Sequence, residues 1–536
     1  MKRLLMAVAV LAVVWVAGCS GGGSTKITPP PPVGFTNGSL KGTYVFSMTG
    51  TTADPNFGTS SFSRVGVFIA DGGGNIQTTG GLEDQHQFGS NNTFAINGGS
   101  YVINSDGRGT LSLINSGGTV QYSIALTSSS SGYMVDMAGG TTATDSETAS
   151  GSFQLQTATT IAAGTYIFDF SGLDPGSGNP TSLVGDFVAS AAGAGSFSPG
   201  SFVDINDGGT LTTKAILSGG TYATDNTNPG TGRGFATFAN NLDYVYYVID
   251  SQHVLLMDID PDAEGVAPGT NIGEAVAQQA GTPTLTSSFS NSSFVFVVGG
   301  SSTTNGAPHT RGVRLTATGG ALSAILLDDN NDGVVTSIPA TGVIGNGTVT
   351  LDGDGSGRGT FSFTENASNT FTFVFYLSSA TQGVIQDVSL VQFQGSTIPD
   401  EVADGTLLAQ TGAPFSSSSL ATNYAFSSSG VSSSEEDFVG QFAPATASPN
   451  GHVDFNEPGS ASQTVFLDVA LGGVITVGGD GTGSTGTHST FVATINGTPS
   501  TTINYFAYIA NPTTILLMTG QSNARIAAGV LTAQTP

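Results

Sequence analysis

The chain has 536 residues, of which 38 are acidic and 12 are Lys or Arg, so its formal net charge is −26. Such an acidic chain lacks the basic surface that phosphates require, which excludes nucleic acid as a partner. Its one cysteine excludes intramolecular disulfides and cysteine-ligated metal sites. Hydrophobic residues make up 38% of the chain, which is enough for several packed domains, and the length predicts three or four.

The first 20 residues are typical of an export signal. Lys2 and Arg3 precede an apolar run, Leu4 to Val16, which is too short for a membrane-spanning helix. The run ends in Val16-Ala17-Gly18-Cys19, which resembles the lipobox of bacterial lipoproteins. The resemblance implies a signal peptide over residues 1–18, cleavage before Cys19 and acylation of the new N-terminus at that thiol. Because Ser20 is not aspartate, the resemblance also favours the outer membrane over the inner one.

Residues 19–38 form a predicted tether between the lipid anchor and the first domain. Residues 20–24 are rich in Gly and Ser and therefore flexible, and Pro29 to Pro32 favour a short, stiff polyproline stretch. The tether would hold the rest of the chain off the membrane. We therefore predict a cell-envelope protein, anchored by lipid to the outer membrane, with its body either surface-exposed or periplasmic.

After the tether, the chain repeats itself four times. Each repeat begins with two aromatic residues at period two, which places both rings on one face of a strand. Each repeat ends in a six-residue frame from Gly to Gln, and these frames lie 122 to 132 residues apart. The aromatic pairs are Tyr44/Phe46, Tyr166/Phe168, Phe294/Phe296 and Tyr424/Phe426, and the frames are residues 151–156, 273–278, 405–410 and 529–534. The landmarks predict domains at residues 39–158, 162–280, 286–411 and 415–536.

Two further landmarks recur inside the repeats. A Gly-x-Phe segment begins at Gly66, Gly185 and Gly440, and the third repeat offers Gly312-Val-Arg314 in its place. A Gly-Arg-Gly segment recurs at residues 107–109, 232–234 and 357–359, and the fourth repeat offers Gly481-Thr-Gly483. Each copy is domain-sized, because solenoid units usually run about 20–50 residues. We therefore predict four beads on a string with short polar linkers, and not a propeller.

Within a repeat, nearly every segment is typical of a β-strand. Aromatic and β-branched runs alternate with clusters of Gly, Asn, Asp and Ser, and no segment shows a sustained helical stripe. The predicted fold class is all-β, with four tandem antiparallel β domains of about eight strands each. Short consecutive turns favour an up-and-down barrel over a β-sandwich. The architecture resembles the small barrels of lipocalins and avidins, but no motif of either family is present.

Arg108, Arg233 and Arg358 stand out because the chain has so few cations. A recurrent arginine could grip a carboxylate of a ligand or partner, since the planar guanidinium binds carboxylates in two places. Alternatively, it could form a structural ion pair with an acid of its own repeat, for example near Asp204 or Asp329. The structural interpretation explains more simply why the arginine recurs in successive repeats.

Acidic turns offer candidate metal ligands. Asp204, Asp329 and Asp454 are predicted to occupy one place in three repeats, and Glu83-Asp84 the same place in the first. Calcium requires six to eight oxygen ligands, and three runs offer alternating oxygens. These runs are Asp258, Asp260 and Asp262; Asp328, Asn330 and Asp332; and Asp352 and Asp354.

The calcium hypothesis has a simpler alternative. The EF-hand pattern fails because Pro339 and Phe363 stand where the twelfth-position glutamate of the last two runs should be. Asp, Asn and Gly are also the residues that ordinary tight turns require. Calcium is thus the one cofactor for which the sequence offers ligands, and no other is predicted.

Catalytic motifs are missing from the sequence. The five histidines share no repeat position and no metal-ligand spacing, and there is no G-x-S-x-G segment. They are His86, His253, His309, His452 and His488. The single tryptophan lies in the signal, so a carbohydrate-binding platform would have to use Tyr or Phe. We predict that the chain is not an enzyme.

Three functions remain in view. The first is a non-enzymatic surface spacer, adhesin or multivalent binding module for an unknown protein or glycan, with the membrane contacted only through the lipid anchor. The second is a carrier with an apolar ligand inside each barrel, which requires an internal cavity and not a packed interior. The third is an extracellular hydrolase, which requires a cleft with convergent carboxylates.

Overall fold

The computed structural model describes most of the chain from residue 34 onward. The described residues are 34–54, 58–87, 89–137, 146–174, 176–217, 219–238, 242–260, 270–279, 289–339, 343–366, 369–393, 396–432, 434–444, 448–458, 463–478, 488–497, 500–522 and 525–536. The predicted signal peptide, Cys19, most of the predicted tether, Asp262 and Gly481-Thr-Gly483 lie outside them. Within the described residues, no helix has the length and hydrophobicity that a membrane crossing would need.

The described residues form strands and two short 3-10 helices, η1 (Asn37–Ser39) and η2 (Ser417–Ser419). Repeat 1 contains β1 (Lys41–Asp54), β2 (Gly58–Asp71), β3 (Asn75–Ile76), β4 (Gly81–Gln87), β5 (Ser90–Ile103), β6 (Arg108–Asn115), β7 (Gly118–Ser128), β8 (Ser131–Asp136) and β9 (Ser146–Leu155). Repeat 2 contains β10 (Gly164–Leu173), β11 (Pro180–Ala189), β12 (Ala194–Ser196), β13 (Phe202–Asp207), β14 (Thr210–Ile216), β15 (Thr221–Thr224), β16 (Arg233–Thr237), β17 (Asp243–Asp250), β18 (His253–Asp258) and β19 (Asn271–Ala277).

The second half of the chain follows the same plan. Repeat 3 contains β20 (Ser290–Ser302), β21 (Pro308–Thr318), β22 (Ala321–Asn331), β23 (Val334–Ile338), β24 (Gly347–Leu351), β25 (Arg358–Asn366), β26 (Asn369–Leu377), β27 (Gln382–Asp387), β28 (Leu390–Phe393), β29 (Ser396–Pro399) and β30 (Glu401–Ala409). Repeat 4 contains β31 (Tyr424–Val431), β32 (Glu435–Phe442), β33 (Gly451–Pro458), β34 (Gln463–Thr476), β35 (Ser489–Ile495), β36 (Thr501–Asn511), β37 (Thr514–Thr519) and β38 (Ile526–Ala533).

Three repeats fold as closed antiparallel barrels and repeat 2 as an open, barrel-like antiparallel sheet, which confirms the predicted fold class. The first strand of every repeat pairs with the last one, as β1 with β9 and β31 with β38. Repeats 1, 3 and 4 close completely, whereas the sheet of repeat 2 stays open between β12 and β14. The predicted aromatic pairs point into the barrels, where Tyr44, Phe46, Tyr424 and Phe426 are fully buried.

One glycine in each first strand lets that strand approach the last one. A Cβ atom at Gly50, Gly172, Gly300 or Gly430 would lie 1.9 to 2.2 Å from a backbone oxygen of the last strand or, for Gly172, of Thr270 just before it. No real Cβ contact is that short, so only glycine fits. The same close approach of the first strand to the last one is therefore built into all four repeats.

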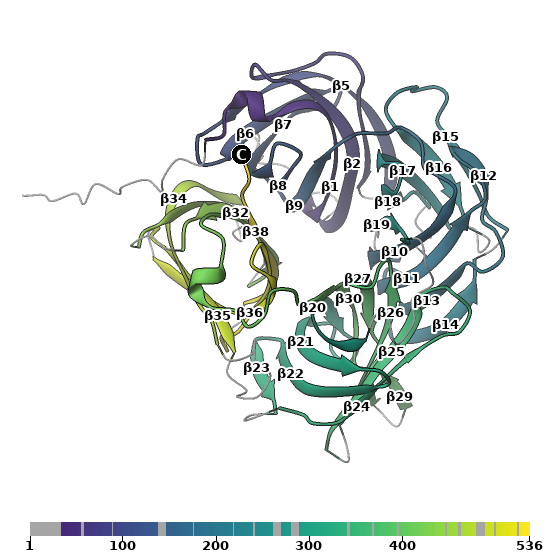
Figure 1. Cartoon of the computed structure of the whole chain (residues 1–536). Helices are drawn as coiled ribbons and strands as arrows, with labels where there is room; N and C mark the ends of the chain where they lie inside the picture. The colour runs from purple at the N-terminus through teal and green to yellow at the C-terminus, as the bar shows by residue number, and fades with distance from the viewer. Residues whose placement is uncertain are drawn as a thin grey trace, which may run out of the picture.

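The four barrels contact one another and form a closed ring (Figure 1). Our prediction of beads on a string is therefore wrong. Alternate residues of the first strands, such as Val45 and Val295, point out of their own barrel and are buried against the next one. Four apolar clusters fill the junctions: Val45/Val65/Val67/Tyr247/Met257, Ile167/Val184/Val374/Tyr376, Val295/Tyr508/Met518 and Ala425/Val439/Ala125/Val135. The last of these joins repeat 4 to repeat 1.

The glutamine that ends each repeat frame clamps the following barrel. Gln156 donates to the carbonyl oxygens of Thr231 and Val248 in repeat 2, at 2.9 and 2.7 Å. Gln534 closes the ring by donating to Asp106 and Leu126 of repeat 1, at 3.0 and 2.8 Å. Gln278 and Gln410 make the corresponding bonds to Ser356, Leu377 and Ile509. Two sequence landmarks, the frame and the Gly-Arg-Gly turn, thus meet across each of the junctions 1–2, 2–3 and 4–1.

The strand register shows that our sequence alignment of the third repeat with the other repeats is wrong by one residue at Gly312. Phe46, Phe168 and Phe426 pair with Gly66, Gly185 and Gly440, but Phe296 pairs with Val313. Gly312 is therefore not the counterpart of the other three glycines. The same shift makes Asp328, and not Asp329, the counterpart of Asp84, Asp204 and Asp454.

A closed ring predicts compact dimensions in solution. Small-angle scattering of residues 34–536 should give a radius of gyration close to the roughly 23 Å expected for a compact chain of this length. A row of four separate domains would give a clearly larger value and would contradict the ring.

Candidate functional site

At each junction, a buried carboxylate of one repeat faces the following repeat. Asp84, Asp204, Asp328 and Asp454 lie at one register position and are at most 5% exposed. Burying an ionised carboxylate is costly unless a cation and hydrogen-bond donors compensate for the lost water. The neighbouring repeat supplies those groups.

The junctions 1–2 and 2–3 use the predicted arginines. Arg233 grips Asp84 with Nε and Nη2 at 2.6 and 2.7 Å, and the Tyr247 hydroxyl donates to the same carboxylate at 2.6 Å. Arg358 grips Asp204 with both contacts at 2.7 Å, and here the hydroxyl comes from Tyr376, also at 2.7 Å. Each tyrosine lies opposite its arginine on the neighbouring strand.

The junction 3–4 replaces the arginine with a histidine that the sequence did not single out. His488 Nδ1 lies 3.0 Å from Asp328, and the Tyr508 hydroxyl donates to the same oxygen at 2.5 Å. Because Ser489 pairs with Ala507, His488 stands opposite Tyr508, as Arg233 stands opposite Tyr247. His488 follows a Gly- and Ser-rich segment that has no counterpart of equal length in the other repeats, so this equivalence cannot be recognised from the sequence.

The junction 4–1 is built differently and leaves a cleft. Arg108 contacts Asp106 at 3.1 Å and Asp468 at 2.7 Å, whereas Asp454 is 3.7 Å away. Ala125 occupies the position, opposite the arginine or histidine, that holds a tyrosine at the other three junctions. A cleft of about 440 Å³ lies beside Arg108, lined by Asn104, Ser105, Asp106, Gly109, Thr110, Ser123, His452, Asp454, Leu467 and Asp468.

The arginines also contact acids of their own repeats. Arg233 lies 2.7 Å from Asp225, and Arg358 lies 3.3 Å from Asp352. The structural interpretation expected such pairs. It did not expect that each arginine would also pair with an acid of the neighbouring repeat. Asp204 is an example, because it belongs to repeat 2 and binds Arg358 of repeat 3.

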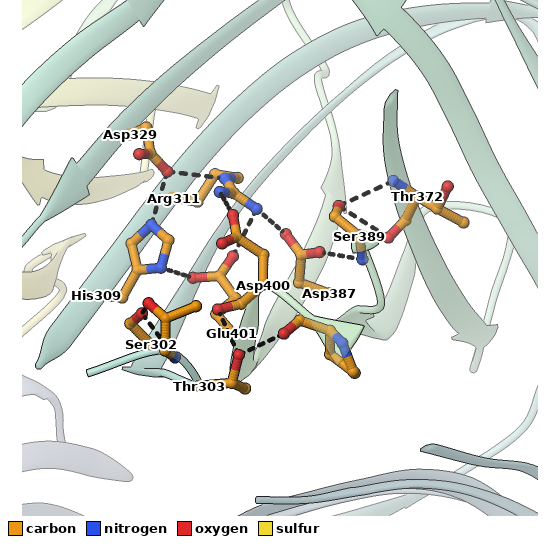
Figure 2. Close-up of polar contacts among 12 residues, drawn as sticks. Ser302, Thr303, His309, Arg311, Asp329, Thr372, Asp387, Ser389, Asp400 and Glu401 are labelled. Atoms are coloured by element: carbon orange, nitrogen blue, oxygen red, sulfur yellow. Dashed lines mark hydrogen bonds and ion pairs between the residues drawn. The ribbon is translucent and has the colours of Figure 1, made fainter. Parts of the chain in front are cut away.

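A second charged cluster fills one end of the third barrel (Figure 2). Arg311 is 1% exposed and contacts Asp387, Glu401, Asp329 and Asp400 at 2.5, 2.7, 2.9 and 3.1 Å. His309 bridges Asp329 and Glu401 with its two ring nitrogens, at 2.7 and 2.5 Å. The cluster thus joins strands β21, β22, β27 and β30 into a polar plug.

The charges in this plug shift one another's pKa values. Burial alone would lower the pKa of His309, but the charge of Glu401 and the hydrogen bond to Asp329 raise it to about 10. Burial raises the pKa of Asp387 to about 7 against the opposing charge of Arg311. Burial would also raise the pKa of Glu401, yet Arg311 and His309 hold it below its ordinary value. His309 is therefore a cation at neutral pH and serves as a second positive partner in the plug.

Charged plugs of this kind occur in repeats 1 and 3 and not at the same position of repeats 2 and 4. Arg64 occupies the same register position in repeat 1, where it contacts Glu147, Asp136 and Glu83. Repeats 2 and 4 carry Leu183 and Phe438 there, which belong to the apolar cores. The sequence did not reveal these clusters, because Arg64 and Arg311 follow the aromatic pairs of their repeats at different distances.

The predicted calcium ligands are engaged in other contacts. Asp328 binds His488, Tyr508 and Ser337, and Asn330 donates to the Thr519 carbonyl oxygen at 3.1 Å. Lys214 lies 2.5 and 2.6 Å from Asp352 and Asp354. Asp258 accepts from Asn271 and from the amide of Asp260, and Asp332 lies in the turn after β22. Within the described ranges, which omit Asp262, no three acidic, His or Cys side chains are grouped as ligands of one metal ion.

Comparisons with known proteins find only remote similarity. No family model matches the chain, and neither does any curated protein. Kievitone hydratase from Nectria haematococca shares 10% identity with a TM-score of 0.20, over 46% of this chain and 90% of that one. Transferrin-binding protein B from Haemophilus parasuis also gives 10% and 0.20, over 76% of this chain and 83% of that one. Scores this low support no argument about function.

The buried pair Arg233–Asp84 should contribute more to stability than the more open contacts of Arg108. We expect Arg233→Ala to lower the free energy of unfolding by about 3 kcal/mol, because it leaves a buried carboxylate without its cation. Arg108→Ala should cost less, because its partner Asp468 is 70% exposed. Urea unfolding measures both, with the exposed Lys41→Ala as control.

A double variant identifies the cause of that loss. Asp84→Asn combined with Arg233→Ala should be more stable than Arg233→Ala alone, because no uncompensated charge remains. Equal effects of Arg233→Ala and Arg108→Ala would contradict the assigned difference between the two junctions.

Buried carboxyl groups at the junctions predict a stability that falls between pH 4 and 7. Burial raises the pKa of Asp404 and of Asp437 to about 7, and each hydrogen-bonds a serine of an adjacent repeat. An unfolded aspartate ionises near pH 4, so over this range the unfolded chain releases protons that the folded chain keeps. Rising pH therefore favours unfolding. Asp354, whose pKa is lowered to about 2, changes the free energy of unfolding only at lower pH.

Denaturant midpoints at pH 5 and pH 8 test this directly. The midpoint should be lower at pH 8, and Asp404→Asn with Asp437→Asn should reduce the difference. A midpoint that rises with pH over this range would contradict the assignment.

Proposed function

We propose that the chain is a lipid-anchored cell-envelope protein that acts as a non-enzymatic binding module. The observation that carries the proposal is the closed ring with one open junction. Three junctions bury their carboxylates under an arginine or histidine and a tyrosine, and the junction 4–1 leaves a polar cleft. A closed scaffold that presents a polar cleft is suited to binding, and we favour this over four weak sites on a string.

The spacer and carrier hypotheses lose support from the packing. A ring does not extend from the membrane as a row of domains would. Each barrel interior is filled by aromatic and aliphatic side chains, whereas three cavities of more than 300 Å³ among the described residues lie between repeats or at the surface. A carrier would require that volume inside a barrel.

The hydrolase hypothesis keeps one supporting observation. Asp106, Asp454 and Asp468 converge on the same cleft, and burial raises the pKa of Asp454. A carboxyl group with a raised pKa beside other carboxyl groups is the arrangement that glycoside hydrolysis uses. Incubation of the chain with oligosaccharides, followed by assay of released reducing ends, distinguishes a hydrolase from a binding module.

Anchoring and exposure are tested on cells. Cys19→Ala should move the protein from the membrane fraction to the soluble one, because the lipid chains supply the membrane affinity. The wild type should incorporate labelled palmitate and the variant should not.

Protease treatment of intact cells then reports the face of the membrane. Surface exposure predicts loss of the body without lysis, with a periplasmic protein as the intact control. Survival of the body until the outer membrane is permeabilised would redirect the search for partners to the periplasm. Membrane association that persists in Cys19→Ala would contradict the anchor itself.

A further inference from the structure

The junction 4–1 is open because small side chains replace larger ones. Ser123 occupies the register position of Val245, Val374 and Phe506. Thr110 stands two residues after Arg108, as Thr360 does after Arg358, whereas Phe235 follows Arg233 and stacks on its guanidinium at 4.5 Å. Tyr133 packs into the apolar cluster next to Ala125, so the free volume lies on the side of Ser123 and Thr110.

An arginine and a histidine of this cleft hold a carboxylate that is itself mostly in water. Arg108 Nη2 and His452 Nδ1 lie 2.7 and 2.9 Å from the same oxygen of Asp468. The Asp468 side chain is 70% exposed, whereas those of Arg108 and His452 are 8% and 15% exposed. An exposed carboxylate gains little from such pairing, so a second carboxylate can compete for its place.

The backbone at Asp468 has a conformation that recurs in another repeat with a different side chain. Its amide donates to Asp454, and its φ is +54°. Lys214 in repeat 2 has the same arrangement, with an amide that donates to Asp204 and a φ of +51°. Lys214 reaches across its junction to Asp352 and Asp354, as Asp468 reaches to Arg108. The framework therefore does not depend on which charge stands at this position.

We propose that the cleft binds a hydroxylated carboxylate, of the chemical class of a uronic acid, whose carboxylate displaces Asp468 from Arg108 and His452. This inference rests on the proposed function and names the ligand chemistry of its site. Asp106 and Asp454 accept hydrogen bonds from the hydroxyl groups of the ligand, and Ser123 and Thr110 donate to them. Leu467, which is 57% exposed, covers an apolar face of the sugar ring of the ligand.

The charges and the volume select this class. A doubly charged phosphate would be repelled by Asp106 and Asp454, which lie beside Arg108. A volume of about 440 Å³ accommodates a sugar ring and not only a small anion. A neutral sugar would leave Asp468 in place and would gain no ion pair.

Calorimetry on the purified full chain tests the proposal with three probes: glucuronate, glucose and acetate. Glucuronate should bind at least roughly tenfold more tightly than either of the others, because it alone has both the carboxylate and the hydroxyl groups. Equal binding of acetate and glucuronate would identify an adventitious anion site and would overturn the class.

Two variants test the site without removing a buried charge. Asp468→Asn removes the internal competitor and should tighten glucuronate binding about tenfold. Thr110→Phe copies Phe235 at the exposed rim and should abolish binding. Lys214→Ala, the matched change at the junction 2–3, should leave binding unchanged.

The outcomes separate this inference from the proposed function. Unchanged affinity in Asp468→Asn would overturn the displacement, and binding that survives in Thr110→Phe would place the ligand elsewhere. If glucuronate binds neither the wild type nor Asp468→Asn, the ligand class is wrong. Anchoring and surface exposure are measured on cells and do not depend on the cleft, so Thr110→Phe should behave there as the wild type does.

Discussion

The architecture depends on one constraint: a buried carboxylate in each repeat that its own barrel does not neutralise. An ionised carboxylate without a partner costs several kcal/mol in a protein interior. Asp84 is neutralised by Arg233 and Asp204 by Arg358, so the cation arrives only when the next barrel docks. The outward valines of the first strands would likewise expose an apolar patch on an isolated barrel. Folding of each repeat and assembly of the ring are therefore coupled through the same surfaces.

At the junction 4–1, which closes the ring, the two repeats must stay docked without the peptide linker that connects the repeats at the other three junctions. The chain runs directly from repeat 1 to 2, 2 to 3 and 3 to 4, whereas repeats 4 and 1 meet only through non-covalent contacts. Several bonds compensate there. Gln534 clamps two carbonyl groups, Tyr133 bonds Thr532 at 2.6 Å, and Asn456 donates to Asp136 and Glu147 of repeat 1. These contacts hold the ring shut while the arginine end of the same junction stays open to solvent.

Much of the fold follows from local pattern, and the ring does not. Period-two aromatics, glycine turns and the repeat frames are short-range signals, and they predicted the strands and the barrels. The ring depends on partners as remote as Arg233 and Asp84, 149 residues apart, or Gln534 and Asp106, 428 residues apart. Nothing local distinguishes a glutamine that clamps a neighbour from one that faces water. His488 and Arg311 were missed for a related reason, since changes in loop length hide their register until the strands are paired.

The position of the cleft couples ligand binding to the ring itself. A ligand held by Arg108 of repeat 1 and His452 of repeat 4 spans the junction that lacks a covalent connection. Anything that binds the closed form and not the open one stabilises closure in proportion to its occupancy. Asp468 already performs this bridging from within the chain, because its carboxylate joins both groups. Exchanging that internal bridge for an external one preserves the ring while it occupies the cleft, so binding need not cost the scaffold its closure.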